Sequence, residues 1–361
     1  MNTPGFLGRL FGRSAAPGPA PGPQDPHKPA APAPNKPAAP ASGGPGLQAY
    51  ELGEEIGRGA MAAVYKATER ATGRQVAIKR LALQREFAAE DLADVRERFM
   101  REARAARQLQ HPDILRVLDA GEADGDTWIA MEYVLGRDLS AYARIGDLLP
   151  VREVLALVIR LARALHYAHS QGVIHRDIKP ANIMLDRVSH SIKLMDFGIA
   201  RVADGSRTRT GLVLGTPSFM SPEQLAGLHV DGRSDLYSLG VLLYQLLTGQ
   251  LPHQSDSMAK LLYRIANVAP PDVRHFRPEL PESLALVLAL ALEKRPELRY
   301  ANGETLAQDL EAVLAQMPQD PAPPVQPGGP GASEPGTFEQ TLRLDLQEPV
   351  QNPASPPHDH S

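Results

Sequence analysis

Residues 175–182 read His-Arg-Asp-Ile-Lys-Pro-Ala-Asn, and residues 196–198 read Asp-Phe-Gly. Together the two segments supply an aspartate that can accept a hydroxyl proton, a lysine for a migrating phosphate, and an asparagine and a second aspartate for Mg²⁺. These residues are Asp177, Lys179, Asn182 and Asp196. Any one of them alone would be an ordinary polar loop residue, but the complete set indicates a site of phosphoryl transfer.

The set resembles the catalytic core of the eukaryotic-like, or Hanks-type, serine/threonine protein kinases of bacteria, and the resemblance runs from about Tyr50 to about Met317. It implies an α+β fold with two lobes, a small β-rich N-lobe and a larger α-helical C-lobe, between disordered tails. The implied boundaries are 1–46 for a Pro/Ala-rich N-terminal tail, 47–317 for the catalytic domain and 318–361 for a Pro/Gly-rich C-terminal tail. Within the domain, the N-lobe takes about 47–131, the hinge about 132–135 and the C-lobe about 136–317.

Composition excludes several other classes of protein. With 43% apolar residues, the 361-residue chain can bury a sizeable core, and its formal net charge of −4 gives no sign of nucleic-acid binding. The sequence contains no cysteine, which excludes disulfides, thiolate zinc sites and cysteine nucleophiles.

The sequence also predicts where the protein is found. No stretch approaches about 18 uninterrupted apolar residues, and the apolar cluster at 6–11 is interrupted by Arg9 and too short for the core of a signal peptide. We therefore expect no transmembrane segment and a cytoplasmic protein, unlike the members of the resembled family that carry a transmembrane helix after the kinase domain.

The two tails contain too few apolar residues to fold alone. Residues 14–46 and 318–336 are mostly Pro, Ala and Gly, a composition that cannot bury enough apolar area to offset chain entropy. The cluster at 6–11 is either a short amphipathic helix or a frayed end. An apolar island at 337–346 can present a phosphothreonine to a partner; the alternatives are a chance cluster or a segment that packs back on the helical lobe.

Between the tails, the hydrophobic pattern changes from strand to helix. Alternating and β-branched residues at 50–67 and 75–81 predict a small sheet. Apolar residues recur every three or four positions at 151–172, which predicts an amphipathic helix. Residues 236–247 are apolar on nearly all sides and precede Gly249, which predicts a buried helix.

Two segments of the predicted sheet match nucleotide-binding motifs of the family. Residues 56–64, Ile-Gly-Arg-Gly-Ala-Met-Ala-Ala-Val, are similar to the glycine-rich loop whose amides lie over the phosphates, although Ala62 replaces the third glycine. Residues 76–79, Val-Ala-Ile-Lys, match the strand whose lysine neutralises the α- and β-phosphates. Glu102 is the expected partner of Lys79. The weaker rivals are Glu97 and Glu90.

Residues 128–134, Trp-Ile-Ala-Met-Glu-Tyr-Val, look like the strand and hinge that join the lobes. The resemblance implies that backbone groups of Glu132 and Val134 bind adenine and that Met131 guards the pocket behind it. Asp138 either reaches the ribose or starts a helix. The residues expected at the nucleotide are Ile56, Gly57, Gly59, Val64, Ala77, Lys79, Glu132, Val134 and Asp138.

The segment after residue 198 matches the family's activation segment and substrate platform. Thr216 matches the platform threonine which, together with Lys179, marks serine/threonine kinases. Thr208 and Thr210 are the expected autophosphorylation sites, because a phosphate there can dock on Arg176. The alternative is that they are merely exposed threonines.

Three further residues have expected structural roles. Glu223, in the Ser-Pro-Glu motif at 221–223, is expected to pair with Arg299 in the helical lobe. Asp235 resembles the aspartate that hydrogen-bonds the backbone of the catalytic loop.

The resemblance implies a serine/threonine protein kinase that transfers the γ-phosphoryl group of ATP to protein hydroxyls with Mg²⁺ or Mn²⁺, activated by autophosphorylation. Asp177 deprotonates the acceptor, Lys179 and the Lys79–Glu102 pair support the phosphates, and Asn182 with Asp196 binds the metal. The resemblance also implies four kinds of partner: protein substrates, a forkhead-associated-domain reader, a cognate phosphatase and a second copy for trans-autophosphorylation.

Two other functions stay open. A pseudokinase scaffold would usually have lost Lys79, Asp177 or Asp196, and all three are present. A small-molecule kinase would share the H-x-D-x-x-x-x-N skeleton, but the complete platform motif at 216–223 argues against it.

Overall fold

The computed structural model describes residues 46–59, 62–85, 90–123, 125–197 and 217–318. These residues all fall within one compact unit. The predictions for the two tails, for the activation-segment threonines Thr208 and Thr210 and for Thr216 lie outside the described residues.

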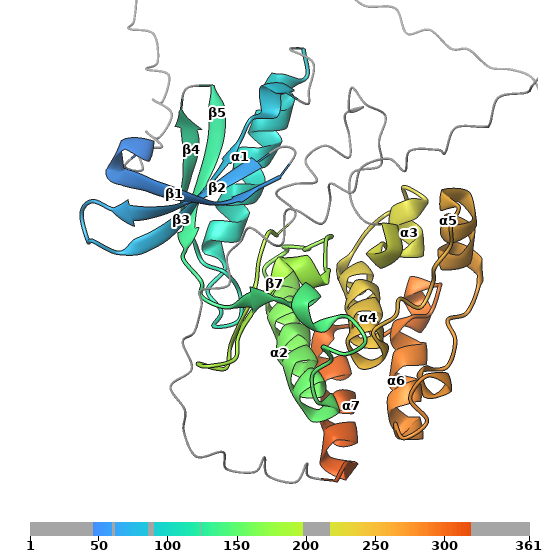
Figure 1. Ribbon diagram of the computed structural model, residues 1–361. Helices are drawn as coiled ribbons and strands as arrows, with labels where there is room; N and C mark the ends of the chain where they lie inside the picture. Colours follow the sequence, from blue (N-terminus) through green and yellow to red (C-terminus); the bar gives the residue numbers. More distant parts are fainter. Residues whose placement is uncertain (1–45, 60–61, 86–89, 124, 198–216, 319–361) are drawn as a thin grey trace, which may run out of the picture. The chain divides into compact units, whose positions relative to one another are not determined.

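The N-terminal part of the domain is an antiparallel sheet of five strands in the order β1-β2-β3-β5-β4, flanked by one long helix, α1 (Leu92–Gln108) (Figure 1). Side chains of β3 alternate between two apolar layers, because successive residues of a strand point to opposite faces. Val76 and Ile78 pack with Tyr50 and Trp128, whereas Ala77 faces the main core. The strands are β1 (Tyr50–Arg58), β2 (Ala62–Glu69), β3 (Gln75–Leu81), β4 (Val117–Ala123) and β5 (Asp126–Glu132).

The C-terminal part is helical and is built around α4 (Gly232–Thr248), which is buried along nearly its whole length. Gly249 caps this helix in the left-handed conformation, at φ 72°, as the sequence predicts. Helix α2 packs against both α4 and α7, and α6 also contacts both α4 and α7 (Figure 1). The other helices are α2 (Val151–Ser170), α3 (Pro222–Leu225), α5 (Met258–Asn267), α6 (Glu282–Ala291) and α7 (Gly303–Gln316).

A second, three-stranded sheet, in the order β6-β7-β8, lies at the junction of the two parts. Its last strand is tied to the segment that leads into β4: Leu194 donates its N–H to the Asp113 carbonyl at 2.8 Å and accepts from the Leu115 amide at 2.9 Å. The strands are β6 (Arg137–Asp138), β7 (Ile183–Asp186) and β8 (Ser191–Leu194). The predicted division into a β-rich N-lobe and a helical C-lobe is therefore confirmed.

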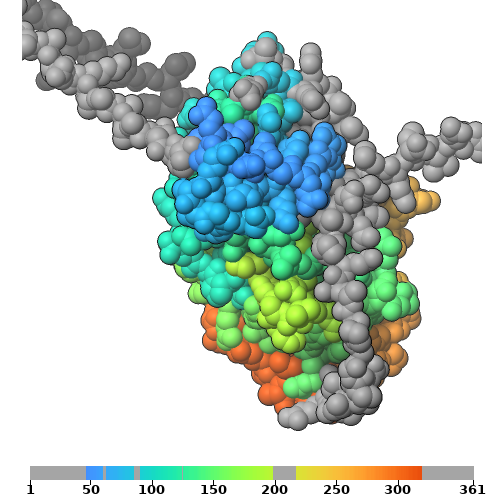
Figure 2. Space-filling view, turned by 60° about the vertical axis from the view of Figure 1, so that its left-hand side comes forward, coloured from blue at the N-terminus to red at the C-terminus, as the bar shows by residue number. Residues whose placement is uncertain are grey.

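Figure 2 shows the same division on the surface, where the blue and cyan residues of the N-lobe cover one end of the domain and the orange and red residues of the C-lobe cover the other.

Short 3₁₀ turns complete the described chain. They are η1 (Leu47–Ala49), η2 (Leu83–Arg85), η3 (Leu139–Tyr142), η4 (Pro180–Asn182), η6 (Pro217–Phe219), η7 (Val273–His275) and η8 (Pro296–Leu298). Among the described residues, no helix has the length and apolar character needed to cross a membrane.

Candidate active site

The catalytic loop brings three of the predicted residues together. The side-chain amide of Asn182 donates to both the carbonyl and the Oδ2 atom of Asp177, each at 2.8 Å. The ammonium of Lys179 lies 3.3 Å from the same Oδ2 atom. Within the described part of the chain, the Oδ1 atom of Asp177 has no hydrogen-bond partner, so it is the oxygen left to accept a proton from a substrate.

The backbone of the catalytic loop is hydrogen-bonded to Asp235 on α4, as predicted. This buried carboxylate accepts the backbone amides of His175 at 2.8 Å and Arg176 at 2.6 Å, and it also contacts the ring of His169 at 2.8 Å. Because Asp235 is 1% exposed, these hydrogen bonds form away from water, where they are worth more than at the surface. The contact from His169 on α2 was not predicted.

Two site residues have strained backbones. Arg176 has φ 66° and Asp196 has φ 56°, in the left-handed region that side chains with a Cβ rarely adopt. Each such residue costs about 1–3 kcal/mol and persists only where its surroundings enforce it. The amide hydrogen bond from Arg176 to Asp235 and the ion pair of Asp196 with Lys79 supply that enforcement.

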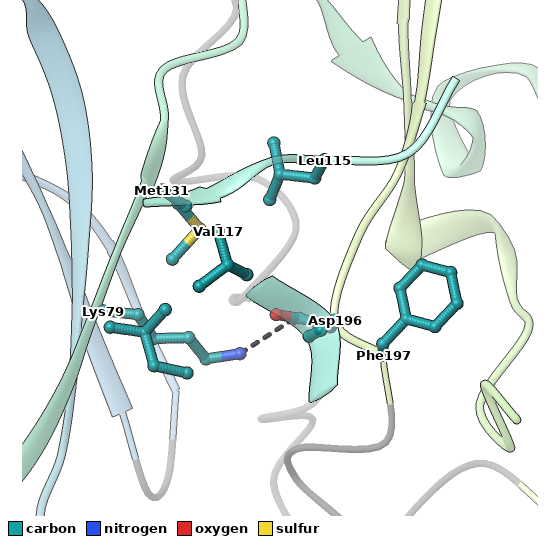
Figure 3. Close-up of a pocket in the computed structure, with 8 residues that line it drawn as sticks. Lys79, Leu115, Val117, Met131, Asp196 and Phe197 are labelled. Atoms are coloured by element: carbon teal, nitrogen blue, oxygen red, sulfur yellow. Dashed lines mark hydrogen bonds and ion pairs between the residues drawn. The ribbon is translucent and has the colours of Figure 1, made fainter. Parts of the chain in front are cut away.

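Lys79 on β3 is paired with Asp196 rather than with the residue predicted for it. Its ammonium lies 2.8 Å from Asp196 Oδ2 (Figure 3). Burial by itself raises the pKa of Asp196, but the attraction of Lys79 outweighs it, so the pKa lies below its usual range. No ion pair joins Lys79 to Glu102 among the described residues, and the Lys79–Glu102 pair stays a prediction.

A pocket lies between the lobes beside this ion pair. Figure 3 shows Met131 on β5 and Lys79 on β3 on one side, with Asp196 and Phe197 opposite. Met131 therefore lines the pocket as predicted. The lining residues that the sequence analysis did not identify are Ala106, Leu115, Val117, Ile129 and Phe197. Their apolar side chains carry no local signal that distinguishes a pocket wall from ordinary core.

Phe197 and His175 join the two catalytic motifs. Their ring centroids lie 4.6 Å apart, and the His175 ring also contacts the Met195 carbonyl at 2.7 Å. Both rings are buried. The contacts fix the segment that carries Asp196 against the loop that carries Asp177.

Several of the residues expected at the nucleotide lie on β1, β2 and β3, and of the full set only Lys79 lines the pocket. Gly57 and Val64 are partners in the β1–β2 pairing, and the Gly59 amide donates to the Ala62 carbonyl at 2.8 Å, which closes the described part of the glycine-rich loop. Ile56, Val64 and Ala77 are buried at this end of the sheet. Asp138 starts η3, where its carboxylate accepts the Ser140 amide at 2.8 Å, but its side chain is buried and not exposed as the helix-start alternative expected.

The predicted pair of Glu223 and Arg299 is present and buried. Two hydrogen bonds of 2.6 and 2.7 Å join the guanidinium to the two carboxylate oxygens, and Glu223 also accepts the Ser234 hydroxyl at 2.6 Å. Ser221 and Gln224 form a capping box at the start of α3. This part of the platform is therefore fixed to the helical lobe.

Asn182 and Asp196 fit the metal role predicted for them. Both can offer oxygen donors, which hard cations such as Mg²⁺ prefer. The Nδ2 atom of Asn182 is used by Asp177, so its Oδ1 atom is the one available to a cation. The described residues contain no cluster of three or more His, Asp or Glu side chains at ligand distance.

An aspartate held by Asn182 and Lys179, the Lys79–Asp196 ion pair and a pocket between a β-rich and a helical lobe are typical of ATP-dependent phosphotransferases. Comparison with known proteins agrees. A family model described as "Protein kinase domain" matches residues 50–310. The chain belongs to the protein kinase family, and its domain is of the bacterial serine/threonine type.

The similar proteins include several bacterial kinases. The probable serine/threonine-protein kinase SCO3848 of Streptomyces coelicolor is 42% identical over 74% of this chain and 40% of the relative. PknB of Mycobacterium leprae is 39% identical over 75% of this chain and 44% of the relative. The chain thus spans less than half the length of these relatives.

Solved structures give the same result. The kinase domain of Mycobacterium tuberculosis PknI matches with a TM-score of 0.59 and 35% identity, over 73% of this chain and 96% of that one. Rad53 (1–466) in complex with AMP-PNP matches with a TM-score of 0.60 and 25% identity, over 72% of this chain and 64% of that one.

Proposed function

We propose that this chain is an active protein kinase that transfers the γ-phosphoryl group of Mg-ATP to serine and threonine hydroxyls of protein substrates. The proposal rests on the contacts of the Asp177 carboxylate. Its Oδ2 atom accepts a hydrogen bond from Asn182 and lies beside the ammonium of Lys179, while Oδ1 remains available to an acceptor hydroxyl.

The residues of this chain divide the reaction between them. Asp177 accepts the proton of the acceptor hydroxyl, and Lys179, beside it, offsets charge on the migrating phosphoryl group. Mg²⁺, when bound, supplies charge neutralisation at the β- and γ-phosphates, and Asn182 and Asp196 would hold it. Lys79 would leave its ion pair with Asp196 for the α- and β-phosphates, with Glu102 as its new partner.

The proposal extends to activation and to partners. Phosphates on Thr208 and Thr210 would dock on Arg176, whose backbone is already held by Asp235. Protein substrates, a forkhead-associated reader, a phosphatase and a second copy for trans-autophosphorylation remain the predicted partners. The cytoplasmic location likewise stays a prediction.

The experiment compares the wild-type chain with Asp177→Asn, using Mg-ATP and either a generic basic protein, an aminoglycoside or choline as the acceptor. Phosphate transfer by the wild type to the protein alone, lost in the variant, supports the proposal. Transfer to a small molecule would favour a small-molecule kinase, and binding of nucleotide without transfer to any acceptor would favour a pseudokinase. Mass spectrometry of the wild type that finds no phosphate on Thr208 or Thr210 would refute the activation step.

A further inference from the structure

A charged cluster outside the catalytic loop surrounds the first residue of the hinge. Glu132 ends β5, and its Oε1 atom lies 2.7 Å from the ammonium of Lys193 on β8. The same oxygen accepts the backbone amide of Arg116 at 2.9 Å, and the Glu132 amide donates to the Arg116 carbonyl at 3.0 Å. One carboxylate thus connects the hinge to two other segments.

The two charged side chains are partly shielded from water. Lys193 is 17% exposed and Glu132 is 30% exposed as side chains. Partial burial weakens solvent screening, and hydrogen bonds between ionised groups are about twice as strong as those between neutral ones. Fully exposed ion pairs contribute little to stability. This pair is partly buried, so it can hold the Glu132 side chain in place against β8.

Lys193 stands on a strand that is itself fixed. Its neighbours Ile192 and Leu194 are fully buried, and Leu194 is hydrogen-bonded to the Asp113–Leu115 segment that precedes β4. Three residues beyond Lys193, the same stretch carries Asp196. The position of the hinge is therefore set relative to the segment that holds the metal-binding aspartate.

The next hinge residue is held from the opposite lobe. The ammonium of Lys66 on β2 lies 5.2 Å from the centre of the Tyr133 ring, within the range of a cation–π interaction. Consecutive hinge residues are thus contacted by one lysine from each lobe. Such an arrangement restricts how the backbone between them can turn.

We propose that the Glu132–Lys193 pair is a positioning element for nucleotide binding: it holds the hinge backbone in the orientation that receives adenine. This inference rests on the proposed function, because it assigns adenine to the hinge. Neither side chain is a catalytic residue, since each acts through the backbone of Glu132. The pair should therefore contribute to nucleotide affinity and not to the chemical step.

The test uses the full chain and two probes, Mg-ATP and adenosine. Adenosine has no phosphates, so it reports on the hinge and not on Lys79. Lys193→Met is expected to raise KM for ATP and Kd for adenosine by the same factor of about five, equivalent to about 1 kcal/mol, with kcat within about twofold of the wild type. Lys193→Arg, which keeps the charge, should restore both.

Two controls separate positioning from general stability. Arg187→Met breaks a more exposed ion pair, Arg187–Glu153 at 3.2 Å, at the other end of the β7–β8 hairpin, and should leave both constants unchanged. Lys79→Met should weaken ATP binding but not adenosine binding. Unchanged adenosine affinity in Lys193→Met, or an equal loss in Arg187→Met, would overturn the positioning role. A wild-type chain that binds neither probe would instead overturn the proposed function.

Discussion

Replacing Arg299 with methionine should destabilise the domain severely. The Arg299 side chain is fully buried, and besides Glu223 its guanidinium donates to the carbonyls of Glu293 at 2.6 Å and Lys294 at 2.8 Å. It also lies 4.9 Å from the ring of Tyr237. Methionine fills much of the volume but leaves the Glu223 carboxylate buried without its cation.

The cost follows from that buried charge. Removing one partner of a buried ion pair costs about 3–5 kcal/mol, a large share of the roughly 5–15 kcal/mol that stabilises a typical domain. For a domain of this size the midpoint of thermal unfolding should fall by about 5–9 °C. The double variant Glu223→Gln/Arg299→Met should recover much of the loss, because it removes the unpaired charge as well.

The assay is urea unfolding followed by circular dichroism at a helical wavelength, which reports on the lobe that contains the pair. Arg295→Met is the matched control, since Arg295 pairs with Glu297 at 3.8 Å on the surface of the same segment and should contribute almost nothing. A loss below about 1 kcal/mol for Arg299→Met, or one equal to the Arg295→Met value, would refute the reasoning.

The same pair predicts a pH dependence. Burial raises the pKa of Glu223, but its hydrogen bonds from Arg299 and Ser234 outweigh burial and hold the pKa below its usual range. A carboxylate whose pKa is lowered by folding contributes its full stabilisation above its unfolded-state pKa of about 4.3. That contribution is lost as the pH falls through the pKa of the folded state. The advantage of the wild type over Glu223→Gln should therefore shrink below about pH 4.3.

Three further predictions concern other parts of the domain. Asp196→Asn should lower phosphate transfer at least roughly a hundredfold and change its Mg²⁺ dependence, because a charged group at the transition state is lost; near-normal turnover on a generic protein would contradict this. Burial, with a smaller effect of Arg299, lowers the pKa of Lys294 to about 8, so the folded domain holds this proton less tightly than the unfolded chain. The wild type should gain stability relative to Lys294→Met as pH rises from 8 towards the ordinary lysine pKa near about 10.4, and parallel urea midpoints over that interval would rule it out. Arg152 donates to the carbonyls of Leu314 and Met317 at 3.0 Å each. Arg152→Met should therefore lower the free energy of unfolding by about 1–2 kcal/mol and speed amide exchange in the last turn of α7. Unchanged exchange there would show that the contact is unimportant.

Much of the fold could be predicted from the sequence, because local patterns determine it. The apolar run that forms α4 and the glycine after it define a buried helix and its end. The Glu223–Arg299 pair and the contacts of Asp235 were also predicted, since they belong to motifs of the resembled family.

The remaining features depend on how distant segments pack. The sequence places Glu102 on a helix but does not fix the position of that helix relative to β3, and Lys79 pairs with Asp196 instead. Glu132 was predicted only for its backbone, and nothing in the sequence marks Lys193 as a partner of its side chain until β8 and the hinge are brought together. Phe197 was noticed only as part of a motif, because its contact with His175 is a matter of tertiary packing.

The contacts of Asp235 have a mechanical consequence. The loop that carries Asp177 is hydrogen-bonded through its backbone to Asp235 on α4, a deeply buried helix of the C-lobe. These hydrogen bonds do not involve the sheet that carries Lys79. A tilt of the N-lobe would therefore move the lysine and the glycine-rich loop while leaving the proton acceptor where it is. With nucleotide bound between the lobes as proposed, such a tilt would leave the hydrogen bonds around Asp177 unchanged.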